Sequence, residues 1–205
     1  MNDRIKRATG MAVGTVALGF LTGPAVLAAI TTEVDVNDRK FFSPKTVSIP
    51  VGSSVHWAAS GVDDHSVTQD DLVFDTGAAR AGITLTKTFS AGSYPYHCRK
   101  HGVSGGTMKG TVKVAPQVAP APAGPAFTVK WAAAGTDTGN TFDVKYRVAS
   151  GPWKVWKNNT SAKSMVFGKG GPVAVARGKT YSFQVRSGTG ANESLFSPVK
   201  SFRAS

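Results

Sequence analysis

Cys98 is the only cysteine of this 205-residue chain, and it lies in a short run that also contains His97, His101 and, shortly afterwards, Met108. A single thiolate, an imidazole and a thioether, completed by a second histidine such as His65, form a trigonal His₂Cys set with a weak axial methionine. This donor set suits a copper centre that transfers single electrons. Metal coordination also accounts for an unpaired cysteine, because the metal keeps the thiolate deprotonated. The residues therefore predict one mononuclear blue-copper site.

Strands must position these donors, because the segments between residues 30 and 115 are alternating or β-branched and are separated by glycine turns. The expected strands cover residues 46–49, 54–57, 83–89 and 111–114. A tight loop after a strand that ends at Cys98 turns Cys98 and His101 towards one metal, whereas His65 must come from the loop of another strand. A short helix between residues 72 and 81 stays an alternative. The pattern predicts a β-sandwich that fixes the donors in advance.

The order of the motifs in this part of the chain resembles that of the plastocyanin-like cupredoxins. The motifs are Phe42-Ser43-Pro44, Val55-His56-Trp57, Asp64-His65-Ser66-Val67, Phe74-Asp75-Thr76-Gly77, Tyr96-His97-Cys98 and Met108-Lys109-Gly110-Thr111-Val112. The resemblance implies a Greek-key sandwich that binds one copper ion, and it implies as ligands His65, Cys98, His101 and Met108. The loop between His101 and Met108 is longer than in the family's most familiar forms.

The other two histidines are not predicted to be ligands. His97 alternates with Cys98 along the strand and therefore faces away from the metal, and His56 is interpreted in the same way. A multicopper oxidase or a copper nitrite reductase needs further copper centres with many more histidines, whereas this chain has four in all. We therefore expect a carrier and not an enzyme.

A basic head followed by a long uncharged stretch opens the chain. This pattern, with the helix-breaking Gly23-Pro24 and small residues after it, predicts a secretory signal peptide over residues 1–29 that is cleaved near Ala28. The alternative is an N-terminal membrane anchor, because the uncharged run is long enough to span a bilayer. We expect a secreted or cell-envelope protein, and in that environment an unpaired cysteine is unusual.

Alternating alanine and proline over residues 116–125 predict an extended linker between a copper-binding domain (30–115) and a second domain (126–205). Charge differs across this boundary: residues 30–115 have nine Lys and Arg against eight Asp and Glu, and residues 116–205 have twelve against three. A basic second half favours an anionic cell-wall polymer or membrane surface as partner, rather than nucleic acid. The alternative is a lysine-rich surface without a particular partner.

The second half also has the pattern of a β-sandwich. Its expected strands cover residues 127–131, 141–148, 154–156, 164–167 and 180–186, with a last one ending near Phe202. Trp131, the run from Gly178 to Arg186 and the closing Ser197-Pro198-Val199 resemble a fibronectin type III domain. The resemblance implies that Trp131 lies in the core and that the Tyr181 hydroxyl hydrogen-bonds to the backbone. For Trp153 and Trp156, packing is favoured over a face that binds carbohydrate or polyanions.

Together these patterns predict an exported all-β protein of two sandwich domains joined by a Pro/Ala linker. The first domain binds one copper ion and exchanges single electrons with an unidentified redox protein, and the second spaces or tethers it at the cell envelope. Two alternatives stay open. The chain buffers or delivers copper, or it is an adhesion module that binds wall polymers or other polyanions.

Overall fold

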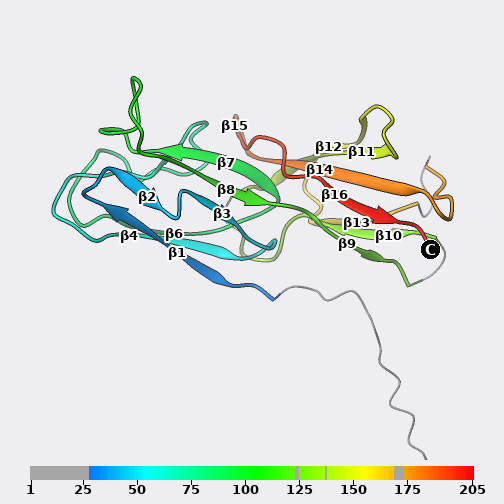
Figure 1. Ribbon diagram of the computed structural model, residues 1–205. Coiled ribbons are helices and arrows are strands. Elements are labelled where there is room, and N and C mark those ends of the chain that lie inside the picture. Colours follow the sequence, from blue (N-terminus) through cyan, green and yellow to red (C-terminus); the bar gives the residue numbers. More distant parts are fainter. Residues whose placement is uncertain (1–27, 123–124, 137, 169–172) are drawn as a thin grey trace, which may run out of the picture.

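Every regular element of the chain is a β-strand. The computed structural model describes residues 28–122, 125–136, 138–168 and 173–205, and in these ranges it has sixteen strands and no helix. The strands form four sheets, which Figure 1 shows as two sandwiches placed end to end. The predicted all-β fold is confirmed. The predicted signal peptide falls almost entirely on residues 1–27, outside the described ranges, and within those ranges no helix has the length and apolar character that crossing a membrane requires.

The first sandwich consists of two four-stranded sheets. One sheet has the order β2-β1-β4-β6, with the bounds Phe41–Ser43, Thr31–Asn37, Ser54–Ala59 and Thr84–Thr88. The other has the order β3-β8-β7-β5, with the bounds Thr46–Ser48, Lys109–Val114, Gly92–His97 and Thr68–Gln69. Strands β1 and β4 are parallel, as are β3 and β8. Residues 72–81 contain turns, bends and isolated bridges rather than the helix left open above.

Aromatic side chains join the two sheets across the core of this sandwich. Trp57 from β4 contacts Tyr96 from β7 with ring centroids 5.3 Å apart, and Phe42 from β2 contacts the same ring at 4.7 Å. Along β7, exposure alternates, so that Tyr94 and Tyr96 face the core. Cys98 continues this alternation just beyond the end of the strand and is fully buried. The period of two therefore brings the thiol to the inner face.

The second sandwich packs a three-stranded sheet against a five-stranded one. The first has the order β13-β10-β9, with the bounds Ser164–Phe167, Phe127–Lys130 and Gln117–Pro120. The second has β12-β11-β14-β15 with β16 paired to β14, and the bounds are Lys154–Thr160, Thr141–Val148, Thr180–Thr189, Asn192–Glu193 and Lys200–Arg203. Trp131 is fully buried, and the Ala176 amide donates to the Tyr181 hydroxyl at 2.9 Å. Both features agree with the sequence-based expectation.

Trp153 and Trp156, the two other tryptophans of this half, also pack against neighbouring side chains. Trp156 lies edge-on to Trp131 with ring centroids 5.9 Å apart. Trp153 is covered by two cations, since Lys145 Nζ lies 5.2 Å and the Arg147 guanidinium 4.8 Å from its ring centroid. Packing of these rings, the interpretation favoured by the sequence, accounts for both positions.

Part of the segment expected to be a linker belongs to a sheet. Gln117–Pro120 is strand β9, which pairs antiparallel with β10, and the amide of Ala121 donates to the carbonyl of Ala126 at 2.9 Å. These four residues, expected to be part of an extended linker, are instead a paired strand of the second sandwich. A strand is compatible with this sequence because β9 lies at the edge of its sheet and Pro120 at the end of the strand, where a missing amide donor is tolerated.

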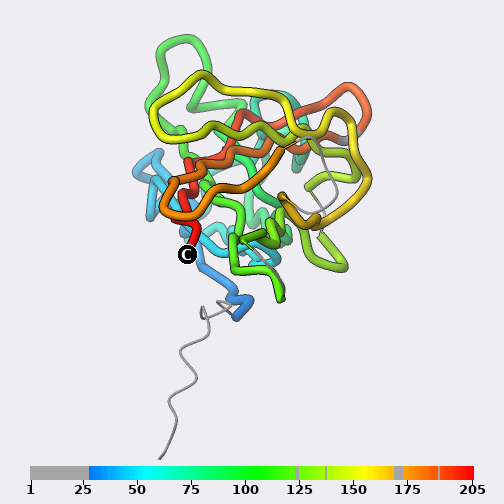
Figure 2. The backbone as a smooth tube through the Cα atoms, turned by 90° about the vertical axis from the view of Figure 1, so that its right-hand side faces the viewer, coloured from blue at the N-terminus to red at the C-terminus, as the bar shows by residue number. Residues whose placement is uncertain are grey.

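The two sandwiches meet through a buried cluster of hydroxyl groups. Tyr94 Oη lies 2.6 Å from Ser187 Oγ, and the Ser90 amide donates to Thr138 Oγ1 at 3.0 Å. Desolvation raises the pKa of Tyr94 although these hydroxyls bond to it, so its hydroxyl stays protonated. At the edge of the cluster, Ser93 and Leu195 form an antiparallel bridge. Figure 2 views the molecule from the side of the second sandwich, with the first lying behind it. The second sandwich is therefore docked on the first.

Candidate metal centre

His65 supplies an unpartnered imidazole nitrogen inside the first sandwich. It lies in the segment between β4 and β5, where its amide and carbonyl both pair with Arg80 at 3.0 Å. The side chain is fully buried. Its Nε2 lies 3.4 Å from Asp38 Oδ1, whereas its Nδ1 has no hydrogen-bond partner in the described part of the chain. A buried polar atom without a partner is costly, so Nδ1 is well placed to bind a ligand from outside the chain.

The loop that follows β7 brings two further donors together. The Gly102 amide donates to the Cys98 carbonyl at 2.7 Å, and this turn places His101 Nδ1 3.7 Å from Cys98 Sγ. Backbone bonds also close the base of the loop: the Cys98 amide donates to the Met108 carbonyl at 3.1 Å, and the Met108 amide to the His101 carbonyl at 3.3 Å. A Cβ on Gly102 would collide with the Met108 carbonyl oxygen. Glycine at this position allows the loop to fold this tightly.

Three of the four predicted ligands converge. One ligand atom from each of His65, Cys98 and His101 lies within 4.8 Å of the others, and the two imidazole rings are 5.1 Å apart. Met108 is fully buried next to them in the backbone network, and its role as axial ligand stays a prediction. One soft thiolate with two imidazoles is a donor set that suits copper. The residues present therefore fit a copper ion.

Burial and nearby charges favour the neutral, metal-binding form of His101. Burial lowers the pKa of His101, and the nearby His65, Lys40 and Lys100 lower it further, while Asp63 opposes them. His101 is therefore neutral at neutral pH and has a free lone pair. The Ser66 amide donates to Cys98 Sγ at 3.4 Å, which ties the sulfur to the segment that carries His65.

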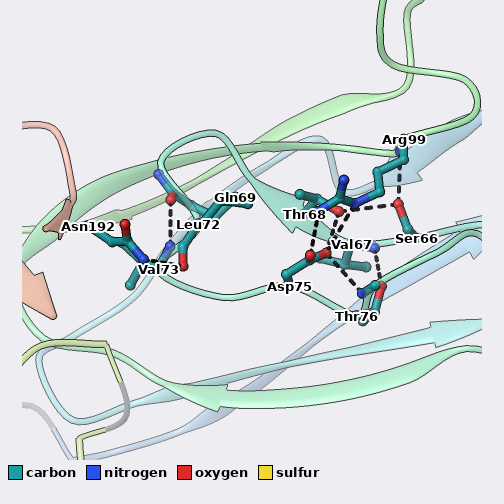
Figure 3. Close-up of polar contacts among 11 residues, drawn as sticks. Ser66, Val67, Thr68, Gln69, Leu72, Val73, Asp75, Thr76, Arg99 and Asn192 are labelled. Carbon is teal, nitrogen blue, oxygen red and sulfur yellow. Dashed lines mark hydrogen bonds and ion pairs between the residues drawn. The ribbon is translucent and has the colours of Figure 1, made fainter. Parts of the chain in front are cut away.

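Side-chain contacts tie the His65 segment to the Cys98–His101 loop, as Figure 3 shows. The Arg99 amide donates to Ser66 Oγ at 2.8 Å, and the Arg99 guanidinium pairs with Asp75 at 2.5 Å. Thr68 Oγ1 donates to the same carboxylate at 2.7 Å. The two ligand-bearing segments are thus fixed relative to each other by groups that do not themselves bind metal.

The second sandwich reaches the same segment from its other side. Asn192 Nδ2, in β15, donates to the Leu72 carbonyl at 3.2 Å. Within the segment, Gln69 Oε1 accepts the amides of Asp71 and Val73 at 2.8 and 2.9 Å. Contacts from both sandwiches therefore hold the chain that follows His65.

We expect Asp75→Asn to weaken this support in a pH-dependent way. Burial opposes ionisation of Asp75, but the bonds from Arg99, Thr68 and the Gly77 amide outweigh it and hold its pKa below the ordinary value. A depressed carboxyl pKa stabilises the fold above the unfolded-state pKa of about 3.9, and this contribution is lost as the pH falls through the lower folded-state value. Urea unfolding should show Asp75→Asn to be less stable than the unmodified chain at neutral pH, with a difference that shrinks in acid.

Asp64→Asn is the matched control for this measurement. Asp64 pairs with Lys100 at 3.2 Å, but both side chains are about half exposed, and exposed pairs of this kind contribute little. The control should unfold like the unmodified chain at both pH values. An Asp75→Asn protein with the same deficit at neutral and acid pH would contradict the assigned ion pair.

The two histidines excluded as ligands have other partners. His97 Nδ1 lies 2.7 Å from Asp70 Oδ1, and His56 lies 2.6 Å from Glu33 and 3.0 Å from Thr84 on the outer face of β4. Neither belongs to the cluster of possible metal ligands. The sequence-based reasoning did not find Asp38 or Ser66. Ser66 follows a predicted ligand directly, whereas nothing in the local sequence relates Asp38 to His65.

Comparison with known proteins finds no matching family model and no matching curated protein. Solved structures do match part of the chain. Its structural neighbours are cupredoxins. A purple cupredoxin from Nitrosopumilus maritimus is 24% identical, with a TM-score of 0.34 over 40% of this chain and 97% of that one. Plastocyanin from Dryopteris crassirhizoma is 20% identical, with a TM-score of 0.33 over 40% of this chain and 99% of that one. A reduced mutant of amicyanin is 24% identical, with a TM-score of 0.32 over 43% of this chain and 85% of that one. With TM-scores this low, these likenesses assign no metal or activity to this chain.

Proposed function

We propose that the first sandwich binds one copper ion through His65, Cys98 and His101, with Met108 as a fourth, weaker ligand, and that the protein carries single electrons. The observation that carries this proposal is the convergence of a buried imidazole, one of whose nitrogens has no partner in the described part of the chain, with a thiol and a second imidazole. Bound copper would supply a Cu(I)/Cu(II) couple, since thiolate and thioether favour the reduced ion and imidazole suits both. On this proposal the protein is a carrier and not an enzyme.

The residues around the proposed site limit the movement of the ligands that would accompany a change in the oxidation state of the bound copper. Cys98 and His65 are fully buried, and the Arg99 bonds to Ser66 and Asp75 join their two segments. Because backbone hydrogen bonds fix His65 to Arg80 and close the loop between Cys98 and Met108, the metal is not needed to bring the donors together. A site held by a scaffold of this kind should exchange electrons faster than a site whose geometry changes with each redox state.

A redox partner would approach the end of the first sandwich that carries the ligand loop. This loop, between β7 and β8, lies at the end farthest from the second sandwich in Figure 1. His101 is only partly buried there, and the nearby Val103 is 46% exposed. The His101 ring is therefore the proposed route for electrons, and the docked second sandwich leaves it accessible.

The basic second sandwich would then keep the copper domain at the cell envelope of an exported protein. Its excess of cations, twelve against three over residues 116–205, supports attraction to anionic wall polymers or lipid headgroups. Binding of the full chain to anionic vesicles or wall polymer that is lost at high salt would support this role. Equal binding to neutral vesicles would argue against it.

The first experiment is the visible absorption and electron paramagnetic resonance spectrum of the full chain with one equivalent of Cu(II). An intense thiolate-to-copper band with narrow hyperfine splitting is the expected result. A pale spectrum would contradict the proposed site. A blue protein that gives up its copper readily to an acceptor but exchanges electrons slowly would favour copper delivery over electron transfer.

For Met108→Leu we expect the blue colour to be kept and the reduction potential to change. The thiolate and imidazoles generate the colour, whereas a weak axial ligand mainly tunes the potential. Leucine conserves the volume of this fully buried side chain, so the cost in stability should stay below about 1.5 kcal/mol. Voltammetry and absorption spectra check the result. An unchanged potential would show that Met108 is not a ligand.

A further inference from the structure

One imidazole nitrogen of His65, Nε2, lies against a carboxylate. Asp38 Oδ1 is 3.4 Å from His65 Nε2, a long hydrogen bond. The His65 ring is fully buried, whereas the Asp38 side chain is 38% exposed. The carboxylate therefore lies at the border between solvent and the buried ring.

The position of Asp38 is fixed by the segment that leads to His65. Asp38 Oδ2 accepts the Val62 amide at 2.9 Å, and Oδ1 accepts the Asp63 amide at 3.1 Å. Gly61 lies directly against the carboxylate, since a Cβ there would collide with its carbon and both oxygens. The backbone of the 61–63 turn thus orients the carboxylate towards the ring.

An ionised carboxylate can only accept hydrogen bonds, so its neighbour must donate. The amides of Val62 and Asp63 donate to the two oxygens of Asp38, and hydrogen bonds of this kind favour the ionised form of a carboxylate. A neutral imidazole carries one N–H, and when that N–H faces the carboxylate the lone pair is on the opposite nitrogen. That nitrogen is Nδ1, the buried atom without a partner.

We propose that Asp38 is a positioning residue that holds His65 in the Nε2–H tautomer and, by making the ring a stronger donor, favours Cu(II) over Cu(I) in the bound copper. This inference rests on the proposed copper site. Carboxylates that accept from a metal-bound histidine act in this way in general, and their loss typically weakens metal binding 10–100-fold. Because the bond is long and the Asp38 side chain is 38% exposed, we expect the lower end of that range.

Asp38, Asp63 and His65 also have ligand atoms close enough to hold a cation of their own. Both Asp38 oxygens already accept backbone amides, however, and these bonds favour the role of a fixed acceptor. The two roles predict different states of His65. A cation would need the Nε2 lone pair, whereas the proposed role needs a proton on Nε2.

The first part of the test reads the tautomer without any copper. Long-range ¹H–¹⁵N correlation spectra of the metal-free full chain at neutral pH should show His65 with its proton on Nε2. A proton on Nδ1, or an even mixture, would overturn the inference. The same spectra of Asp38→Asn should show a mixture, because an asparagine amide can donate to Nε2 as well as accept from it.

The second part measures the potential of the copper-loaded variants. Asp38→Asn should shift the Cu(II)/Cu(I) equilibrium about tenfold towards Cu(I), which is about 59 mV for one electron. Asp63→Asn is the matched control, since it removes the same charge nearby from a side chain that makes no hydrogen bond to His65 within the described residues. Equal shifts of the potential in both variants would show that any lost negative charge near the site has this effect, and would overturn the inference.

Gly61→Ala provides a variant that keeps the charge. Its Cβ must push the carboxylate away from its present position, so His65 should lose the pure Nε2–H tautomer and the potential should rise, as in Asp38→Asn. An unchanged tautomer in both variants would overturn the inference. The proposed function and this inference fail separately, because a chain that does not turn blue contradicts the copper site, whereas the tautomer of the metal-free chain tests Asp38 alone.

Discussion

Replacing Cys98 with serine should abolish the intense blue absorption completely and leave the first sandwich folded. The absorption requires charge transfer from a thiolate, and this chain has no second cysteine to supply one. The fold should persist, because the backbone bonds of Cys98 to Met108 and Gly102 involve no sulfur. Absorption spectra with Cu(II), together with circular dichroism, measure both effects.

His97→Gln is the matched control for this substitution. His97 is the neighbour of Cys98, but its side chain faces the other way and contacts Asp70. The control protein should keep the blue band. An intense band in Cys98→Ser, or its loss in His97→Gln, would contradict the assigned centre.

Tyr94→Phe should destabilise the whole chain by about 1–3 kcal/mol, the cost of leaving buried polar groups without a partner. The Tyr94 hydroxyl lies 2.6 Å from Ser187 Oγ and donates to the Ser90 carbonyl at 3.0 Å. The bond to Ser187 crosses between the sandwiches and the bond to Ser90 lies within the first one, so their loss weakens the docking as well as the first sandwich. Urea unfolding followed by both tryptophan fluorescence and circular dichroism measures the change.

Tyr146→Phe is the control, since its hydroxyl makes no hydrogen bond within the described parts of the chain while its ring packs 4.8 Å from Phe167. It should change the free energy of unfolding by much less. In the unmodified chain the two probes should report one coincident transition, as expected for one cooperative unit. Two separate transitions that Tyr94→Phe leaves unchanged would show that the sandwiches unfold independently and that the hydroxyl cluster contributes nothing.

The strands of this protein follow largely from local patterns. Residues 141–148 and 164–167 are strands with the predicted bounds, because alternation and β-branching determine which face of each segment is buried. Apart from β1, which the expected strands left out although it is seven residues long and internal to its sheet, the segments that were missed or interpreted differently are short and lie at edges, such as β2, β5 and β9. Their pairing depends on what lies beside them, and no periodicity within three or four residues can encode it.

The sequence by itself determined the all-β class and the residue types of the site, since Cys98, His101 and Met108 are close along the chain and alternation along β7 directs the thiol inwards. Only the tertiary structure decided how Asp38 meets His65, how Arg99 joins the two ligand segments, and that Tyr94 reaches Ser187 in the other sandwich. These contacts join residues far apart in sequence, and side-chain hydrogen bonds at that separation leave no periodic trace in either partner. They arise only when the strands have been brought together by the burial of their apolar faces.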